Sequence, residues 1–183
     1  MSTKNNKVIK QTQINKMLIG IGGVSRSGKS TLANLLVTHY RKNGKKAIIF
    51  HQDDFVFSED HIPKIKNRTD WESPYSIDFE LLVDVVEQFK ERFDVVIVEG
   101  LFAFYDEKLN NLYDKKIHVK ISKRTFLIRK AMDSRWGYEP TWFIDHIWQS
   151  FQKYGKPNPI INNVLHTSGE DEFNMKQVIR YLG

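Results

Sequence analysis

Residues 23–30 read Gly23-Val24-Ser25-Arg26-Ser27-Gly28-Lys29-Ser30 and fit the phosphate-binding pattern G-x-x-x-x-G-K-[ST] at each fixed position. The apolar run Met17–Ile21 precedes this stretch and has the length of a strand, and a helical pattern follows from Thr31. Glycine allows the backbone to turn tightly, so that successive N–H groups and the positive end of the helix face an anion. The sequence therefore predicts a strand, a phosphate loop and a helix, in preference to a chance turn rich in glycine and serine.

The loop also predicts which atoms hold a nucleotide. Lys29 is expected to reach the β- and γ-phosphates, and the Ser30 hydroxyl is expected to hold Mg²⁺. The predicted ATP-binding residues are Gly23, Ser25, Arg26, Ser27, Gly28, Lys29, Ser30 and Thr31.

Composition sets the class of protein. The chain has 183 residues, 40% of them hydrophobic and 27% charged, which is ordinary for a globular domain. We expect one domain over residues 17–183, preceded by a polar lead-in at residues 1–16. The chain has no cysteine, which excludes disulfides, thiolate metal sites and a cysteine nucleophile.

Charge and hydropathy give expectations about partners and location. The net charge is +6, yet the lysines and arginines are spread along the chain, so nucleic acid is not an expected partner. No apolar run has the length that spans a bilayer, and the N-terminus leads into no signal-peptide core. We expect a cytoplasmic protein without a membrane partner.

Strand-like and helix-like segments alternate along the chain, which predicts an α/β fold with a parallel sheet covered by helices on both faces. Strands are expected at 17–21, 47–50, 94–98, 116–121 and 160–165. Helices are expected at 29–43, from a cap at Ser76 or Asp78 to about 93, and at 125–133, 141–154 and 171–182. Residues 56–75 show no period. A loop of that length in a compact domain usually serves as a lid or a binding loop.

Two expected strands end in acids. Asp53 and Asp54 follow the strand at 47–50, and Glu99 follows the strand at 94–98. Most strand-end acids are simply solvated turn residues. Ligands of a parallel α/β sheet bind at the carboxyl ends of the strands, which favours a functional role for Asp53 and Glu99. For Asp54, a turn and a functional role both stay open.

Aromatic residues divide into two groups. Trp142, Phe143, Trp148 and Phe151 lie at helical spacing and are expected in the core. Trp71 lies in the aperiodic loop beside Glu72, which favours a binding role over a loop anchor. The six histidines show no metal-ligand spacing.

From about Met17 to Lys153 the chain resembles the uridine kinase and nicotinamide riboside kinase group of P-loop nucleoside kinases. The motifs that carry the resemblance are Gly22–Ala33, Gln52–Phe55, Asp70–Pro74 with Asp78, Glu99–Leu101 and Leu109–Ile117. The resemblance implies a P-loop NTPase-type fold with a small lid around residues 129–141. It also implies an enzyme, a phosphotransferase with ATP as donor and Mg²⁺ as cofactor.

The resemblance implies roles on the acceptor side. Asp53 corresponds to the base near the acceptor 5′-hydroxyl and the metal. Trp71 corresponds to the residue that stacks on the base, and Glu72 corresponds to the acceptor of hydrogen bonds from the ribose hydroxyls. Phe55, in the same motif as Asp53, is expected to contact the substrate. The group usually has Asp where Glu72 stands.

The resemblance implies further roles on the donor side. Glu99 is expected to act on the Mg²⁺ shell together with Ser30 and Asp53. Arg129 and Arg135 resemble lid arginines that close over the phosphates, and with Lys29 they are expected to be catalytic, Arg129 also touching substrate.

The acceptor is expected to be uridine or cytidine, with nicotinamide riboside as the alternative. A pyrimidine needs hydrogen-bond partners for its edge, whereas a cationic pyridinium favours aromatic faces and a nearby acid. Trp71, with Trp136 or Tyr138, favours the cation, whereas the segment around Tyr105-Asp106 and Leu109–Ile117 resembles the uridine kinases. Related kinases of the wider group, which act on pantothenate or phosphoribulose, stay open as alternatives. A nucleotide-binding regulatory protein is the alternative from another class.

Overall fold

The computed structural model describes residues 16–135, 137–159 and 163–183. Five parallel strands form the central sheet in the order β2-β5-β1-β6-β7. Their bounds are β1 Met17–Gly23, β2 Ala47–His51, β5 Val95–Gly100, β6 Lys115–Lys120 and β7 Val164–Ser168. The parallel sheet predicted from the sequence is confirmed.

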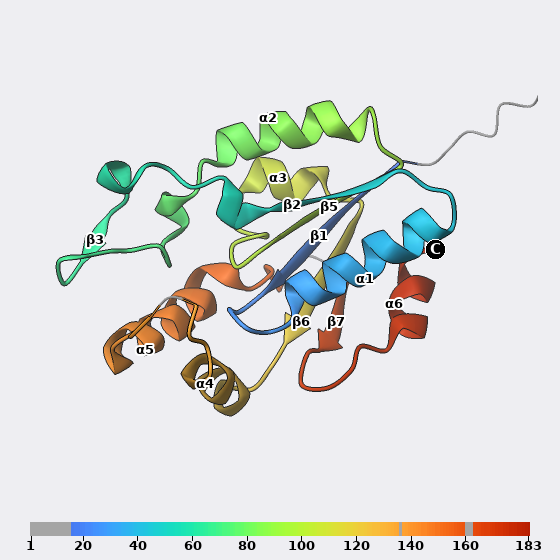
Figure 1. Cartoon of the computed structure of the whole chain (residues 1–183). Coiled ribbons are helices and arrows are strands. Elements are labelled where there is room, and N and C mark those ends of the chain that lie inside the picture. The colour runs from blue at the N-terminus through green and yellow to red at the C-terminus, as the bar shows by residue number, and fades with distance from the viewer. Residues whose placement is uncertain (1–15, 136, 160–162) are drawn as a thin grey trace, which may run out of the picture.

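Helices cover both faces of the sheet (Figure 1). Their bounds are α1 Lys29–Lys42, α2 Phe79–Lys90, α3 Glu107–Leu112, α4 Lys123–Ala131, α5 Thr141–Ser150 and α6 Met175–Leu182. In the picture, α1 and α6 lie on one side of the strands, and α2 and α3 lie on the other. The layers therefore follow the α/β prediction.

Each side of the sheet has its own buried cluster. On the α1 side, Ile19, Ile21 and Ile117 pack with Leu32 and Leu36 of the helix. On the α2 side, alternate strand residues such as Leu18, Val96 and Val98 pack with Leu82 and Val86. A strand buried on both faces is apolar at successive positions, which is the pattern of β1 and β5.

A third buried cluster supports the helices beyond the carboxyl ends of the strands. Phe126 of α4 is fully buried there with Phe143 and Ile147 of α5. Trp142 and Trp148 are partly buried against this cluster, so the expectation that the four aromatics of 142–151 belong to a core is confirmed in the main. The helix predicted over 141–154 is α-helical to Ser150 and continues as a π-helical turn over Phe151–Gly155.

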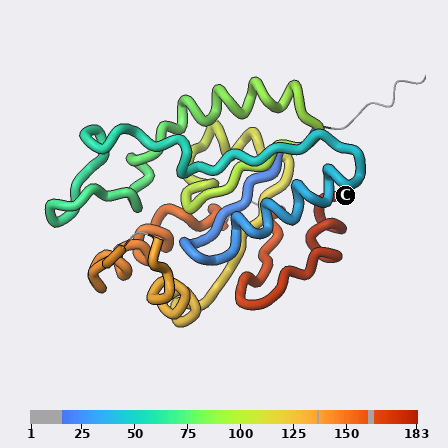
Figure 2. Tube along the Cα trace, in the orientation of Figure 1, coloured from blue at the N-terminus to red at the C-terminus, as the bar shows by residue number. Residues whose placement is uncertain are grey.

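Residues 56–75 are not the structureless loop that the sequence suggested. They contain a small hairpin of β3 Lys64–Ile65 and β4 Arg68–Thr69, and short 3-10 turns at Glu59–His61 and Pro74–Ser76. The backbone path of Figure 2 shows this segment as an arm extending from the main body. Cation-π contacts join the hairpin to α5, with Lys66 over Trp142 at 4.7 Å and Arg68 over Phe143 at 4.9 Å.

Three other boundaries differ from the expectations. α3 was not predicted, and the closing helix begins at Met175 instead of 171. The last strand is Val164–Ser168, four residues later than the expected start at 160, and residues 160–162 lie outside the described part of the chain. Residues 1–15 of the expected lead-in and Trp136 lie outside it as well.

Candidate functional site

The phosphate loop forms the turn between β1 and α1. The Ser27 amide donates a hydrogen bond to the Val24 carbonyl over 3.0 Å, which closes the turn. Arg26 and Gly28 adopt left-handed backbone conformations, with φ of 64° and 96°. Gly28 is the N-cap of α1 and offers no side chain to the first amides of the helix. Those amides are therefore available to an anion, as the motif predicted.

Only glycine fits at the first position of the loop. A Cβ on Gly23 would lie 2.6 Å from Ser27 Oγ and 2.8 Å from the Val119 carbonyl oxygen. The loop is therefore packed directly against β6, and a larger residue at this position would displace the cradle.

Glu99 connects three elements at the carboxyl edge of the sheet. Its Oε1 accepts a hydrogen bond from Ser30 Oγ over 2.8 Å and lies 2.6 Å from His51 Nδ1. Ser30 belongs to α1, and His51 ends β2 directly beside Glu99 in the register of the two strands. The ends of β2 and β5 therefore meet beside the first turn of α1. His51 was missed by the sequence analysis, although its register beside Glu99 follows once β2 and β5 are paired.

The donor set at Glu99 fits a hard cation. Glu99 is 5% exposed, and its Oε2 has no hydrogen-bond partner within the described residues. Mg²⁺ prefers one or two carboxylates with phosphate oxygens and water rather than a full protein cage. No cluster of three or more His, Cys, Asp or Glu side chains suited to a metal occurs in the described ranges.

Asp53 lies on the short 3-10 turn Gln52–Asp54, directly after β2. The turn is anchored by Gln52, which is 1% exposed and whose Oε1 accepts a hydrogen bond from the Phe102 amide over 2.9 Å. The Asp53 side chain is exposed. The buried side chain of Gln52 thus fixes the backbone of the turn from which the Asp53 carboxylate extends into solvent.

Trp71 and Glu72 follow the hairpin and are tied to α5. His146 Nε2 of α5 lies 2.7 Å from Asp70 Oδ1, and the Ser150 hydroxyl donates a hydrogen bond to the Glu72 carbonyl. The Trp71 ring is 43% exposed, which leaves a face available to a ligand. The segment 70–72 and α5 are therefore one connected unit.

Glu72 is the most perturbed carboxyl of this unit. Burial raises the pKa of the Glu72 carboxyl to about 7; the cations of Lys130 and Lys29 lower it, and the charges of Asp53 and Asp70 raise it. The charges of Asp53 on the β2 turn and of Lys29 on the phosphate loop thus both act on the Glu72 carboxyl.

Arg129 is fixed against the phosphate loop. Its guanidinium donates to the Arg26 carbonyl over 3.1 Å and to the Glu170 carbonyl over 2.8 Å. α4 is therefore tied both to the loop after β1 and to the loop after β7.

Arg135 is held by an acid of its own segment. Its Nε and a terminal nitrogen donate to the two oxygens of Asp133, each over 2.7 Å. Hydrogen bonds from Arg135 hold the pKa of the buried Asp133 well below its usual range. Arg26 Nε lies 3.8 Å from the same carboxylate. Lys130 is likewise engaged, 2.7 Å from Glu139 in a buried ion pair.

Two of the predicted site residues, Phe55 and Thr31, make contacts that indicate no ligand. Phe55 is half-buried, with its ring 6.1 Å from that of Phe50 in an edge-to-face contact, so it packs on the sheet as well as following Asp53. Thr31 is exposed on the first turn of α1. Neither makes a contact that assigns it a ligand.

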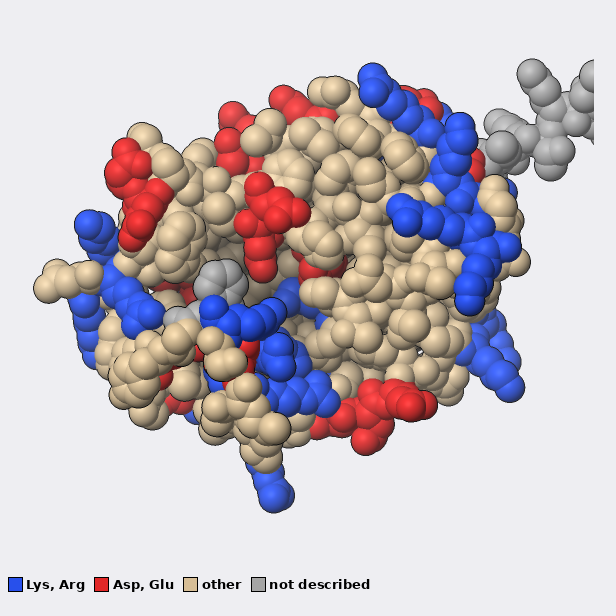
Figure 3. All heavy atoms as spheres, viewed as in Figure 1, with Lys and Arg blue, Asp and Glu red and all other residues tan. Residues whose placement is uncertain are grey.

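The surface over this site is hollowed (Figure 3). Lys and Arg atoms gather at the hollow, with acidic atoms at its margin. Such a distribution suits a polyanion held beside carboxylates. Among the described residues, no helix has the length and apolar character needed to cross a membrane.

Comparison with known proteins agrees with this geometry. The family model described as "Phosphoribulokinase / Uridine kinase family" matches residues 88–154. The matched segment includes Glu99, α4 and α5 and lies outside the phosphate loop, so it supports the resemblance independently of that motif.

Relatives of both predicted kinds are found. A uridine kinase of Ureaplasma parvum is 28% identical over 141 residues, covering 63% of this chain and 68% of the relative. A nicotinamide riboside kinase of Eremothecium gossypii is 27% identical over 176 residues, covering 73% of this chain and 68% of the relative.

A solved structure described as a possible uridine kinase from Bacillus stearothermophilus has the same fold. It superposes with a TM-score of 0.56 at 20% identity and covers 90% of this chain and 91% of that one. Together these similarities confirm the resemblance predicted from the motifs: the chain is similar to the uridine kinases and nicotinamide riboside kinases among the P-loop kinases, and the prediction of a phosphotransferase is confirmed with it.

Proposed function

We propose that this protein transfers the γ-phosphoryl group of ATP to the 5′-hydroxyl of a ribonucleoside, with uridine or cytidine as the first candidates. The observation that carries the proposal is the position of Glu72. The pKa of its carboxyl is shifted both by Asp53, the candidate base, and by Lys29 of the phosphate loop. A donor cradle and an acceptor pocket that share one cleft meet the requirement for in-line phosphoryl transfer.

On the donor side, the loop 23–30 and the N-terminus of α1 bind the phosphates, and Lys29 neutralises charge on the transferred group. Arg129, already directed at the loop by its bond to the Arg26 carbonyl, adds a second cation there. Arg135 reaches the phosphates once it leaves Asp133. Thr31, Ser25 and Ser27 complete the donor set.

The metal that this chemistry implies is Mg²⁺, and the residues that would hold it are Ser30, Glu99 and Asp53. When bound, Mg²⁺ would neutralise phosphate charge that develops in the transition state. Hydroxyl and carboxylate oxygens are the ligand types that it prefers.

On the acceptor side, Trp71 stacks on the base, Glu72 accepts hydrogen bonds from the ribose hydroxyls, and Phe55 supports the wall of the site. Asp53 accepts the proton of the 5′-hydroxyl as that oxygen attacks phosphorus. The bond from the γ-phosphorus to the bridging oxygen breaks, and ADP leaves.

Nicotinamide riboside is the second candidate acceptor. The exposed face of Trp71 beside the acid Glu72 suits a cationic ring. The similarity to the nicotinamide riboside kinase also spans more of this chain, 73% against 63% for the uridine kinase.

The test is an assay of the full chain with Mg·ATP and uridine, cytidine, nicotinamide riboside, adenosine or pantothenate. We expect a monophosphate product from uridine and cytidine. Product from nicotinamide riboside alone would select the second candidate. ATP binding without phosphorylation of any of the five would reject the proposed acceptors and favour a nucleotide-binding regulatory protein.

Asp53→Asn tests the proposed base. We expect turnover to fall by about a hundredfold or more, because the amide cannot accept the hydroxyl proton, while ATP binding is retained. Asp54→Asn, one residue along the same exposed turn, is the matched control and should keep most of the activity. Equal turnover in Asp53→Asn and the parent would remove Asp53 from the mechanism.

A further inference from the structure

One face of the sheet carries polar side chains at β6 and β7. His118 of β6 pairs with His166 of β7 in the parallel register, and Lys120 lies two residues further along β6. Ile117 and Val119, which alternate with these residues, pack in the α1 cluster on the opposite face. The alternation along β6 thus places the His118 imidazole and the Lys120 amine on the same face of the sheet, beside His166 of β7.

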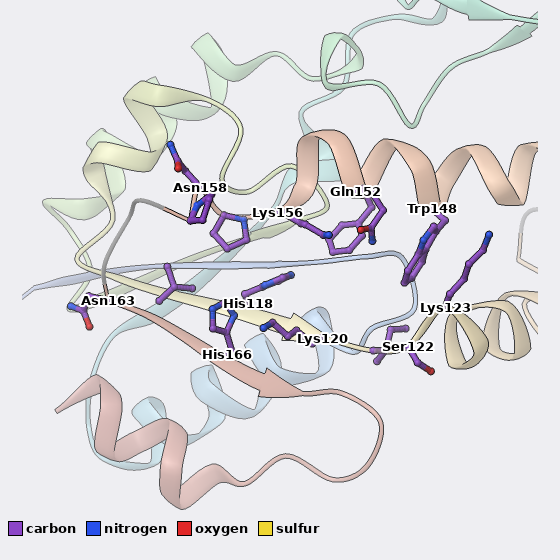
Figure 4. A pocket seen from close by; sticks show the side chains of 15 residues that line it. His118, Lys120, Ser122, Lys123, Trp148, Gln152, Lys156, Asn158, Asn163 and His166 are labelled. Atoms are coloured by element: carbon purple, nitrogen blue, oxygen red, sulfur yellow. The ribbon is translucent and has the colours of Figure 1, made fainter.

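A cavity of about 620 Å³ lies over this polar face. Figure 4 shows His118 and His166 side by side on neighbouring strands, with Trp148 and Gln152 facing them across the space. Lys156 follows on the segment after α5. The volume falls within the range that small-molecule sites occupy, roughly 300–1,000 Å³.

The lining is cationic. Among its described residues are three lysines and two histidines, and no aspartate or glutamate. Lys123 is engaged with Asp145 at 3.0 Å. Neither Lys120 nor Lys156 has an ion-pair partner within the described ranges, so two ammonium groups border the cavity without a counter-charge.

His118 is a buried polar group that lacks a partner. Its side chain is 5% exposed, and neither ring nitrogen makes a hydrogen bond to any described residue. Burial, together with the positive charges of His166, Lys120 and Lys156, lowers the pKa of His118 to about 4. The same cations that line the cavity are therefore close to an imidazole whose donor and acceptor are unused.

One wall of the cavity is aromatic. Trp148 and Phe151 line it, and their ring centroids are 6.0 Å apart. An indole face beside lysines suits a ligand with both a flat ring and a negative charge. Unused polar groups at the floor and an aromatic side wall are the usual features of a site that orients a small organic anion.

The cavity is separate from the phosphate loop. None of residues 23–30 lines it, and the loop begins α1, which packs on the opposite face of the sheet. We propose that the cavity binds a phosphate monoester that carries a flat ring, as a second ligand site distinct from the nucleotide cradle. The phosphate pairs with Lys120 and Lys156 and accepts a hydrogen bond from His118, and the ring lies against Trp148. This proposal does not depend on the proposed kinase activity.

The test follows the imidazole NMR signals of His118 and His166 in the full chain, assigned with His118→Phe and His166→Phe. The phosphate loop is first saturated with Mg²⁺ and a non-hydrolysable ATP analogue, and uridine 5′-monophosphate is then titrated. We expect both signals to shift saturably. The proposal is overturned if neither imidazole signal shifts. It is also overturned if uridine 5′-monophosphate shifts the signals only when the ATP analogue is left out, because the cavity would then be part of the donor site.

The contribution of the two lysines and that of the aromatic ring contact to binding are tested separately. Lys120→Ala combined with Lys156→Ala should weaken binding at least roughly tenfold, because two charge-assisted hydrogen bonds are lost. Lys108→Ala, an exposed lysine of α3, is the matched control and should bind as the parent does. Unchanged affinity in the double variant rejects the site.

Ribose 5-phosphate and inorganic phosphate complete the series of probes. We expect uridine 5′-monophosphate to bind more tightly than ribose 5-phosphate, and the difference to vanish in Trp148→Leu. Equal affinity of these two probes for the parent would overturn the assignment of Trp148 as the ring contact.

Discussion

The two carboxylate oxygens of Glu99 have unequal surroundings. Oε1 is shared by Ser30 and His51, whereas the buried Oε2 has no partner in the described chain. A buried carboxylate oxygen without a hydrogen bond is costly unless another group completes its shell. Ser30 and His51 thus hold Oε1 in place, and the unpaired Oε2 supports the proposal that Glu99 binds Mg²⁺.

His51 should set the orientation of Glu99. In His51→Ala, we expect the Mg²⁺ concentration for half-maximal activity to rise by roughly tenfold, as for other residues that support metal ligands. The measurement is turnover against Mg²⁺ concentration at saturating ATP. His61→Ala, at an exposed histidine of the arm, is the control. An unchanged Mg²⁺ dependence in His51→Ala would contradict the supporting role.

Glu72 should give activity a dependence on pH. The pKa of its carboxyl is raised to about 7, so it is protonated below that pH and ionised above it. The ionised form accepts hydrogen bonds from ribose hydroxyls better, so kcat/KM for the acceptor should rise through pH 7. The measurement is the pH profile of kcat/KM in the parent and in Glu72→Gln.

The rise near pH 7 should be absent in Glu72→Gln and present in Glu80→Gln, which changes an exposed glutamate of α2. A profile in Glu72→Gln that still rises at pH 7 would assign the titration to another group.

At the scale of elements, α2 shows how a single side chain fixes a boundary. Asp78 Oδ1 accepts a hydrogen bond from the Leu81 amide over 2.9 Å at the helix N-terminus. Asp78→Ala should lower the free energy of unfolding by about 1 kcal/mol, since one amide of the first turn loses its partner. Urea denaturation measures the change. Asp78→Ser should restore most of the loss, and Asp84→Ala, in the exposed middle of α2, should have little effect.

Elements with a full period or a continuous apolar run were predictable. β5 and α2 are examples, because burial on two faces or on one stripe leaves a clear pattern. α3 was missed because six residues from Glu107 to Leu112 are too few to show helical periodicity. The hairpin was missed because Lys66 and Asn67, both at positive φ, form its turn in place of the usual Asn-Gly pair.

The end of the sheet was misplaced for a related reason. The segment 160–165 was expected to be the strand, but β7 extends through His166 to Ser168. His166 faces the cavity instead of an apolar core, so the polar end of β7 carried no strand signal. The polar residue His166, which weakened the strand pattern in the sequence, is thus also part of the lining of the cavity over β6 and β7.

At the scale of the molecule, the buried His118 should make stability depend on pH. The pKa of His118 is about 4 in the folded chain, against 6.5 for an unperturbed imidazole. Between these values the unfolded chain binds a proton that the folded chain does not. Stability should therefore fall as the pH drops from 6.5 to 4, by up to roughly 3 kcal/mol.

In His118→Phe this loss should be absent, because phenylalanine fits beside Phe104 and Phe151 without titrating. The measurement is the free energy of unfolding at pH 7.5 and at pH 5, with His61→Gln as the control. An equal loss in His118→Phe and the parent would place the pH dependence elsewhere.

The positions of the residues on the donor side of the candidate site could be predicted from the sequence, whereas those of several residues around them could not. The phosphate loop and Glu99 follow from a motif and from strand ends, which the sequence displays directly. His51, Lys130 and Asp133 were missed, because their roles depend on strand register and on how the segment after α4 packs. Such contacts join residues distant in the sequence and leave no local pattern.

The strand order has a consequence for how the chain forms. β1 is the third strand across the sheet, between β5 and β6, although it precedes both of them along the chain. Its neighbours in the sheet begin at Val95 and Lys115, so β1 has no complete set of partners until about two thirds of the chain has left the ribosome. Pairings this distant along the chain form slowly, and the phosphate loop acquires its shape only when they are complete. A release of the chain before β6 would therefore leave the nucleotide cradle unformed.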